Sequence, residues 1–187
     1  MTDTLFGRQF EQDYPSLCII DQFLLKVRPK GILEIGTGEG GFALYLAVFA
    51  KMNLDADATV ATIDPQNRRD TKALLQKMGA VPSGLPIIFY QTMVQLHAGK
   101  FKSFVSENKP AVIFCDPTKK FLVAGEVAKW LSPGDYLLVH DFLHPESGGM
   151  TEEEAVAIEA MGYERDQPEA WTERGSWLCL RRTDEPS

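Results

Sequence analysis

The chain has 187 residues, of which 44% are hydrophobic and 24% are charged, and its formal net charge is -7. This length and composition predict one soluble globular domain, spanning residues 1–187, with a substantial hydrophobic core. The negative charge argues against nucleic acid as a partner, because proteins that bind the phosphate backbone usually carry a basic face. The apolar stretches are too short to cross a bilayer, so no membrane partner is expected either.

In chain order, apolar patterns and turn residues predict strands that alternate with helices. The strands are expected at 32–35, 59–63, 86–90, 111–115, 136–139, 163–165 and 176–181. The helices are expected at 21–27, within an N-terminal helical segment of about residues 1–30, and at 41–52, 71–78, 97–107, 122–131 and 151–161. This alternation predicts a Rossmann-like, doubly wound α/β sheet of about seven mostly parallel strands with helices on both faces.

Three widely spaced cysteines, Cys18, Cys115 and Cys179, show neither a disulfide nor a zinc spacing. The N-terminus has no basic segment followed by an apolar run, which a signal peptide would have. A reducing cytoplasm is therefore the expected location.

A glycine-rich turn follows the first predicted strand. Its residues are Gly36-Thr37-Gly38-Glu39-Gly40-Gly41. Glycine permits positive φ and close approach of a ligand to the backbone, and the helix that follows directs unpaired N–H groups toward the turn. Glu34 lies inside the preceding apolar strand, where an acid is costly unless a partner or ligand satisfies it. These features predict a site for a nucleoside-type ligand.

Acids stand at or near the carboxyl ends of four predicted strands: Glu34, Asp64, Asp116 and Asp141. Ligands bind outside the carboxyl ends of strands in sheets of this kind. The glycine turn also fits the dinucleotide pattern, with Asp64 where a ribose-binding acid is expected. An NAD-binding protein therefore stays an alternative at this point.

The segment Leu33-Glu34-Ile35-Gly36-Thr37-Gly38-Glu39-Gly40 resembles motif I of the class I S-adenosylmethionine-dependent methyltransferases. Asp64 matches their second-strand acid, and residues 131–141, with Pro133-Gly134 before an apolar run, resemble their lead into strand five. The resemblance covers about residues 20–181. It implies a methyltransferase that uses S-adenosylmethionine.

The resemblance also assigns cofactor contacts. Gly36, Thr37, Gly38 and Gly40 would wrap the methionine part of the cofactor, and Glu34 would lie near its amino end. Asp64 would accept hydrogen bonds from the ribose hydroxyls. Thr92 lies in the segment after the third strand that holds adenine in many relatives, although the Gly-Asp type pair often found there is absent. Asp116 would also contact the cofactor.

The pattern Asp116-Pro117-Thr118-Lys119 together with His140-Asp141 resembles the small metal-dependent O-methyltransferases of the catechol and caffeoyl-coenzyme A type. It is also similar to the group around the cephalosporin hydroxylases and macrolide O-methyltransferases. The resemblance implies that Asp116 and Asp141 bind a divalent cation and that Lys119 acts as a base. His140 replaces a usual carboxylate. If it is a ligand, a transition metal is favoured over Mg²⁺.

Other interpretations of these residues stay open. His140 could itself be the general base, with Asp141 orienting the nucleophile and no metal present. Asp116 and Asp141 could be helix caps, and Lys119 with Lys120 could form a solvated basic turn. The sequence thus predicts methylation of a small molecule, at a hydroxyl, with or without a divalent metal. The N-terminal segments and loops that would enclose a substrate are short. The site is therefore expected either to be open or to be completed by a second subunit, which favours a homodimer.

Overall fold

A computed structural model of the chain describes residues 3–5, 8–10, 12, 14–66, 70–80, 84–144, 146, 148–166, 171 and 177–183. A seven-stranded sheet forms its centre, with the strand order β5-β4-β3-β6-β7-β9-β8. The strands are β3 (Gly31–Ile35), β4 (Thr59–Asp64), β5 (Ile87–Gln91), β6 (Ala111–Cys115), β7 (Tyr136–His140), β8 (Tyr163–Arg165) and β9 (Trp177–Arg182). The first five of these pair in parallel, and β9 runs antiparallel to β7 and β8.

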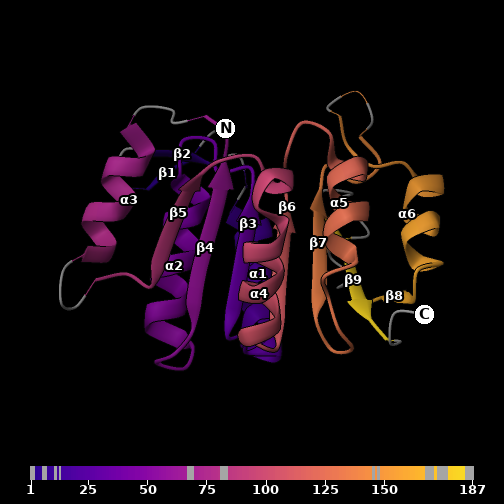
Figure 1. The fold of residues 1–187 in the computed structure, drawn as a ribbon, viewed down its shortest axis with the longest axis horizontal. Coiled ribbons are helices and arrows are strands. Elements are labelled where there is room, and N and C mark those ends of the chain that lie inside the picture. The colour runs from indigo at the N-terminus through magenta and orange to yellow at the C-terminus, as the bar shows by residue number, and fades with distance from the viewer. Residues whose placement is uncertain are drawn as a thin grey trace.

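Helices cover both faces of the sheet. One apolar layer contains residues of α1 (Tyr14–Val27), α2 (Gly41–Asn53) and α3 (Thr71–Ala80). The opposite layer contains residues of α4 (Ala98–Glu107), α5 (Lys120–Ala128) and α6 (Glu152–Glu159). Figure 1 shows α4 and α5 in front of the sheet with α1 and α2 behind it. The predicted doubly wound fold is therefore confirmed.

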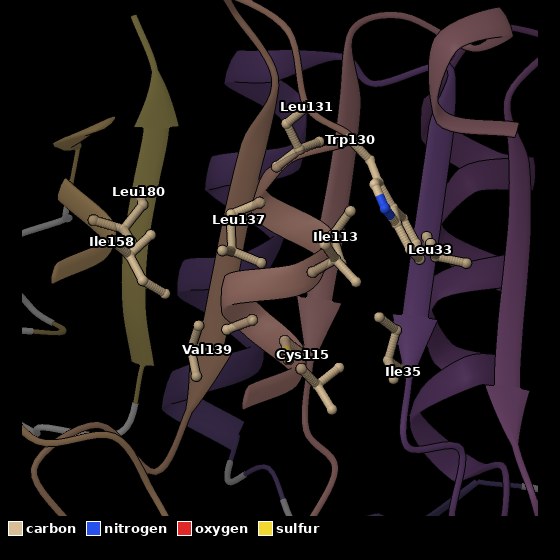
Figure 2. Packing of buried hydrophobic residues seen from close by; sticks show 14 of the residues in the cluster. Leu33, Ile35, Ile113, Cys115, Trp130, Leu131, Leu137, Val139, Ile158 and Leu180 are labelled. Carbon is tan, nitrogen blue, oxygen red and sulfur yellow. The ribbon is translucent and has the colours of Figure 1, made fainter. Parts of the chain in front are cut away.

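The second layer shows how the strand sequences build the core. Side chains alternate between the two faces of a strand, so Leu33 and Ile35 of β3 lie on the same face as Ile113 of β6 and Leu137 of β7 (Figure 2). The strands β3, β6 and β7 are buried along their whole length. Strands covered on both faces read as nearly continuous apolar runs, which is why the sequence located them well.

The element boundaries differ from prediction at several points. A short hairpin, β1 (Asp3–Leu5) with β2 (Arg8–Phe10), precedes α1 and was not predicted. Helix α1 begins at Tyr14 rather than at residue 21, because Pro15 is tolerated in the first turn of a helix. Helix α5 begins at Lys120, two residues before its predicted start. Of the strand predicted at 176–181, residues 177–181 lie in β9, and residue 176 lies outside the described residues.

A capping box opens α6. The Thr151 hydroxyl accepts a hydrogen bond from the backbone N–H of Glu154, and the Glu154 carboxylate accepts one from the backbone N–H of Thr151, at 3.3 and 2.9 Å. The described part of the chain contains no helix that is both long and apolar enough for a membrane span.

Candidate functional site

The glycine turn joins β3 to α2 at the carboxyl edge of the sheet. Gly36, Gly38 and Gly40 all have positive φ, at 101°, 55° and 85°. A Cβ on Gly36 would lie 2.3 Å from the carbonyl oxygen of Asp116, so only glycine allows β3 and the segment after β6 to approach this closely. A Cβ on Gly38 would meet nothing within 4 Å. The turn is thus tight on the sheet side and open at Gly38, where a ligand could reach the backbone.

Asp64, the last residue of β4, is fixed beside this turn. Its Oδ2 accepts a hydrogen bond from the N–H of Gly38 at 3.0 Å, and its Oδ1 accepts one from the N–H of Gln66 at 2.7 Å. The residue is 8% exposed. Each carboxylate oxygen has two acceptor positions, so Asp64 keeps the capacity to accept hydrogen bonds from a ligand.

Glu34 is buried on the neighbouring strand and has an internal partner. The Thr62 hydroxyl donates a hydrogen bond to Glu34 Oε2, and the Thr37 hydroxyl donates in turn to the Thr62 oxygen. Burial raises the pKa of Glu34 to about 8, and the charges of Asp116 and Asp64 add to the rise, although the Thr62 hydrogen bond opposes it. At neutral pH Glu34 is therefore mainly a neutral carboxylic acid.

Thr92 follows β5, which pairs with β4 so that Gln91 lies opposite Asp64. Its side chain is partly exposed and its backbone N–H donates to the carbonyl oxygen of Tyr90 at 3.0 Å. Thr92 thus lies one strand beyond Asp64, at the same edge of the sheet as the glycine turn.

A second group of polar side chains lies at the ends of β6 and β7. One ligand atom from each of Asp116, His140 and Asp141 lies within 4.8 Å of the others, so the three could hold a metal ion. His140 Nδ1 lies 3.2 Å from Asp116 Oδ1 and 3.5 Å from Asp141 Oδ1. The metal itself stays a prediction.

His140 is held between this group and the apolar layer beneath it. Its ring packs against Trp177 of β9 with the ring centres 4.6 Å apart. Burial lowers the pKa of His140, but the Asp116 and Asp141 carboxylates more than offset this, so the pKa lies above its ordinary value. The charged imidazolium is favoured by the acids, whereas the burial of the ring favours the neutral form.

The two lysines after Asp116 are placed in opposite ways. Lys119, the predicted base, is exposed. Lys120 was expected in a solvated turn, and that expectation is wrong: its side chain is 5% exposed, and its Nζ lies 3.1 Å from Asp116 Oδ1 and 2.9 Å from Asp141 Oδ2. Burial disfavours its ammonium form, but the hydrogen bond to Asp141 and the charge of Asp116 outweigh burial and raise the pKa of Lys120.

Comparison with known proteins gives matches among solved structures. No protein-family model matches the chain, and no curated protein does. CmcI with Mg-SAM superposes with a TM-score of 0.67 at 19% identity, over 97% of this chain and 77% of that one. CmcI with SAH gives a TM-score of 0.66 at 18% identity, over 96% and 81%. A methyltransferase from Geobacter sulfurreducens gives 0.64 at 13% identity, over 92% and 80%. The chain has the class I methyltransferase fold.

In this class I methyltransferase fold, nearly all predicted site residues gather at one edge of the sheet. The glycine turn, Glu34 and Asp64 form its first part, with Thr92 one strand further along. Asp116, after the neighbouring strand β6, and His140 and Asp141, at the end of β7 one strand further on, form its second part in the other direction. Lys119 is the exception among them, because its side chain is exposed to solvent. Lys120, which was not predicted as a site residue, lies there instead, with its Nζ 3.1 Å from Asp116 Oδ1; because Asp116 precedes α5, helical spacing gave no signal for this contact.

Proposed function

We propose that this protein is an S-adenosylmethionine-dependent methyltransferase that methylates a hydroxyl group of a small molecule. The observation that supports the proposal most strongly is the glycine turn with Asp64 hydrogen-bonded to it, in a class I methyltransferase fold. Solved structures with this fold contain the relevant ligands: CmcI with Mg-SAM, and a Podospora anserina methyltransferase, PaMTH1, with SAH.

The cofactor would lie along the carboxyl edge of β3, β4 and β5. The open backbone at Gly38 would face its methionine part, and Asp64 would accept hydrogen bonds from the two ribose hydroxyls. Thr92 would lie near the adenine. Glu34, being mainly neutral, would act as a hydrogen-bonding group near the amino end rather than as a full negative charge.

The acceptor hydroxyl would lie near the ends of β6 and β7. Methyl transfer from a sulfonium is an in-line displacement, so the enzyme must align the hydroxyl and help to remove its proton. His140, packed at a tilt against Trp177 and close to the carboxylates of Asp116 and Asp141, is the candidate base, and Asp141 would orient the nucleophile. The position of Lys120 between the acids favours this metal-independent route.

Metal-assisted methylation is a second candidate. The grouping of Asp116, His140 and Asp141 supports it, and so does the structure of CmcI with Mg-SAM. In that case the bound cation would lower the pKa of the acceptor hydroxyl. The two routes separate in a turnover assay on hydroxylated small molecules, because only the metal-assisted route is lost in excess chelator and restored by Mg²⁺.

Calorimetric titration tests the cofactor directly. We expect S-adenosylhomocysteine to bind and NAD not to bind. Asp64→Asn should weaken binding at least about tenfold, because a charge-assisted hydrogen bond contributes about 1.5–3 kcal/mol. Asp57→Asn is the matched control, since Asp57 is an exposed acid paired with Lys30 before the same strand. Binding of NAD without S-adenosylhomocysteine would overturn the proposal.

A further inference from the structure

The group formed by Asp116, His140 and Asp141 at the ends of β6 and β7 already contains a cation. The ammonium nitrogen of Lys120 lies 3.1 Å from Asp116 Oδ1 and 2.9 Å from Asp141 Oδ2. These are two of the three residues that could hold a metal ion. We propose that the Lys120 ammonium is the resident cation of this group and that it keeps a divalent metal ion out.

The fold gives Lys120 little freedom to leave. Lys120 is the first residue of α5, and the next turns of that helix, including Val123, Ala124 and Val127, are buried against the sheet. The side chain of Lys120 is 5% exposed, so its aliphatic stem is covered along with its charge. A lysine with a buried stem normally keeps its ammonium in water, whereas here the ammonium is covered as well and is held by two carboxylates.

The remaining donors fit a hard divalent ion poorly. Mg²⁺ requires near-octahedral oxygen coordination at short distances, and Lys120 occupies one oxygen of each carboxylate. The third potential ligand, His140, offers a nitrogen instead of an oxygen. The ammonium also offsets one of the two carboxylate charges, so an incoming divalent ion would meet repulsion at close range.

This inference concerns a different property from the proposed methyl transfer and does not depend on it. It can be tested without cofactor or substrate. The probe is Mn²⁺, whose free aqua ion gives an electron paramagnetic resonance signal that is lost on binding to protein. Mg²⁺ is then added as a competitor.

The variant that tests the inference is Lys120→Met, which keeps an unbranched apolar stem and removes the charge. Lys119→Met is the matched control, because Lys119 is the adjacent lysine and is exposed. We expect the wild type and Lys119→Met to bind Mn²⁺ weakly and equally. Lys120→Met should bind at least about tenfold more tightly, in the range by which groups surrounding a metal site change affinity. The gain should disappear when Asp141→Asn is added.

A second measurement covers the case in which Lys120→Met folds poorly. A ligand that binds only the folded state raises the melting temperature. Mn²⁺ should therefore raise the melting temperature of Lys120→Met, or of the milder Lys120→Gln, and leave that of the wild type unchanged. Tight binding of Mn²⁺ to the wild type that is lost in Asp141→Asn would overturn the inference. Equal, weak binding by the wild type and both Lys120 variants would overturn it too, because Lys120 would then not be what excludes the metal.

Discussion

Replacing Glu34 with glutamine should change how the stability of the protein depends on pH. Glu34 has a pKa of about 8 in the folded chain, against an ordinary value of 4.5. Between these two pH values the folded chain keeps a proton that the unfolded chain releases, so the contribution of Glu34 to stability is full below pH 4.5 and is lost as the pH rises through 8. Glutamine has no such proton, and its oxygen can still accept the Thr62 hydrogen bond.

The size of the effect follows from the two pKa values. Over the roughly 3.5 pH units between them, at about 1.4 kcal/mol each, the difference in unfolding free energy between Glu34→Gln and the wild type should move by about 5 kcal/mol in favour of glutamine. Glu34 is 2% exposed, so solvent screening reduces this little. Urea unfolding followed by tryptophan fluorescence at a series of pH values from 4.5 to about 9 measures it.

A matched control separates this effect from general surface titration. Glu126→Gln makes the same chemical change at a partly exposed acid paired with Lys129, and its pH profile is subtracted from that of Glu34→Gln. Asp116→Asn should reduce the slope attributed to Glu34, because the Asp116 charge contributes to the raised pKa of Glu34. A difference between Glu34→Gln and the wild type that does not vary with pH would refute the reasoning.

Three further predictions concern stability and can be checked by urea unfolding. Gly36→Ala should destabilise by more than about 2 kcal/mol, because the new Cβ would lie 2.3 Å from the Asp116 carbonyl oxygen, whereas Gly99→Ala, with open space around it in α4, should not destabilise. Asp135→Ala should cost about 2–4 kcal/mol, since it leaves two backbone N–H groups without their carboxylate acceptor, each at 2.8 Å. Thr151→Ala should cost about 1 kcal/mol through loss of the α6 cap.

The sequence predicted the sheet well because its central strands are continuous apolar runs separated by glycine, proline and helical patterns. It also predicted which acids follow which strands. It did not predict the partner of Glu34. That partner, Thr62, lies opposite Glu34 in the β3–β4 register, and the register of two parallel strands is set by the packing of a whole sheet rather than by either strand alone.

The position of Lys120 beside Asp116 and Asp141 could not be predicted from the sequence. Lys119 and Lys120 are adjacent, and consecutive helical residues point about 100° apart. Which of them faces Asp116 and Asp141 therefore depends on the residue at which α5 begins. Helix boundaries are the least certain part of a prediction from sequence, and the predicted start at 122 was two residues late. Because of that small error, Lys120 was expected in solvent, although it is buried in an ion pair with Asp116 and Asp141.

The antiparallel pairing of β9 with β7 has a consequence for how the protein is made. Trp177, which packs against His140 and is its register partner, leaves the ribosome 37 residues later than His140. At bacterial and eukaryotic rates of about 5–20 residues per second, β7 waits roughly 2–7 s for its neighbour. During that interval β7 is an edge strand with unpaired N–H and C=O groups and uncovered apolar side chains, which is the kind of surface that pairs with other chains. Newly synthesised molecules should therefore be most prone to aggregation, and most dependent on chaperones, in this window.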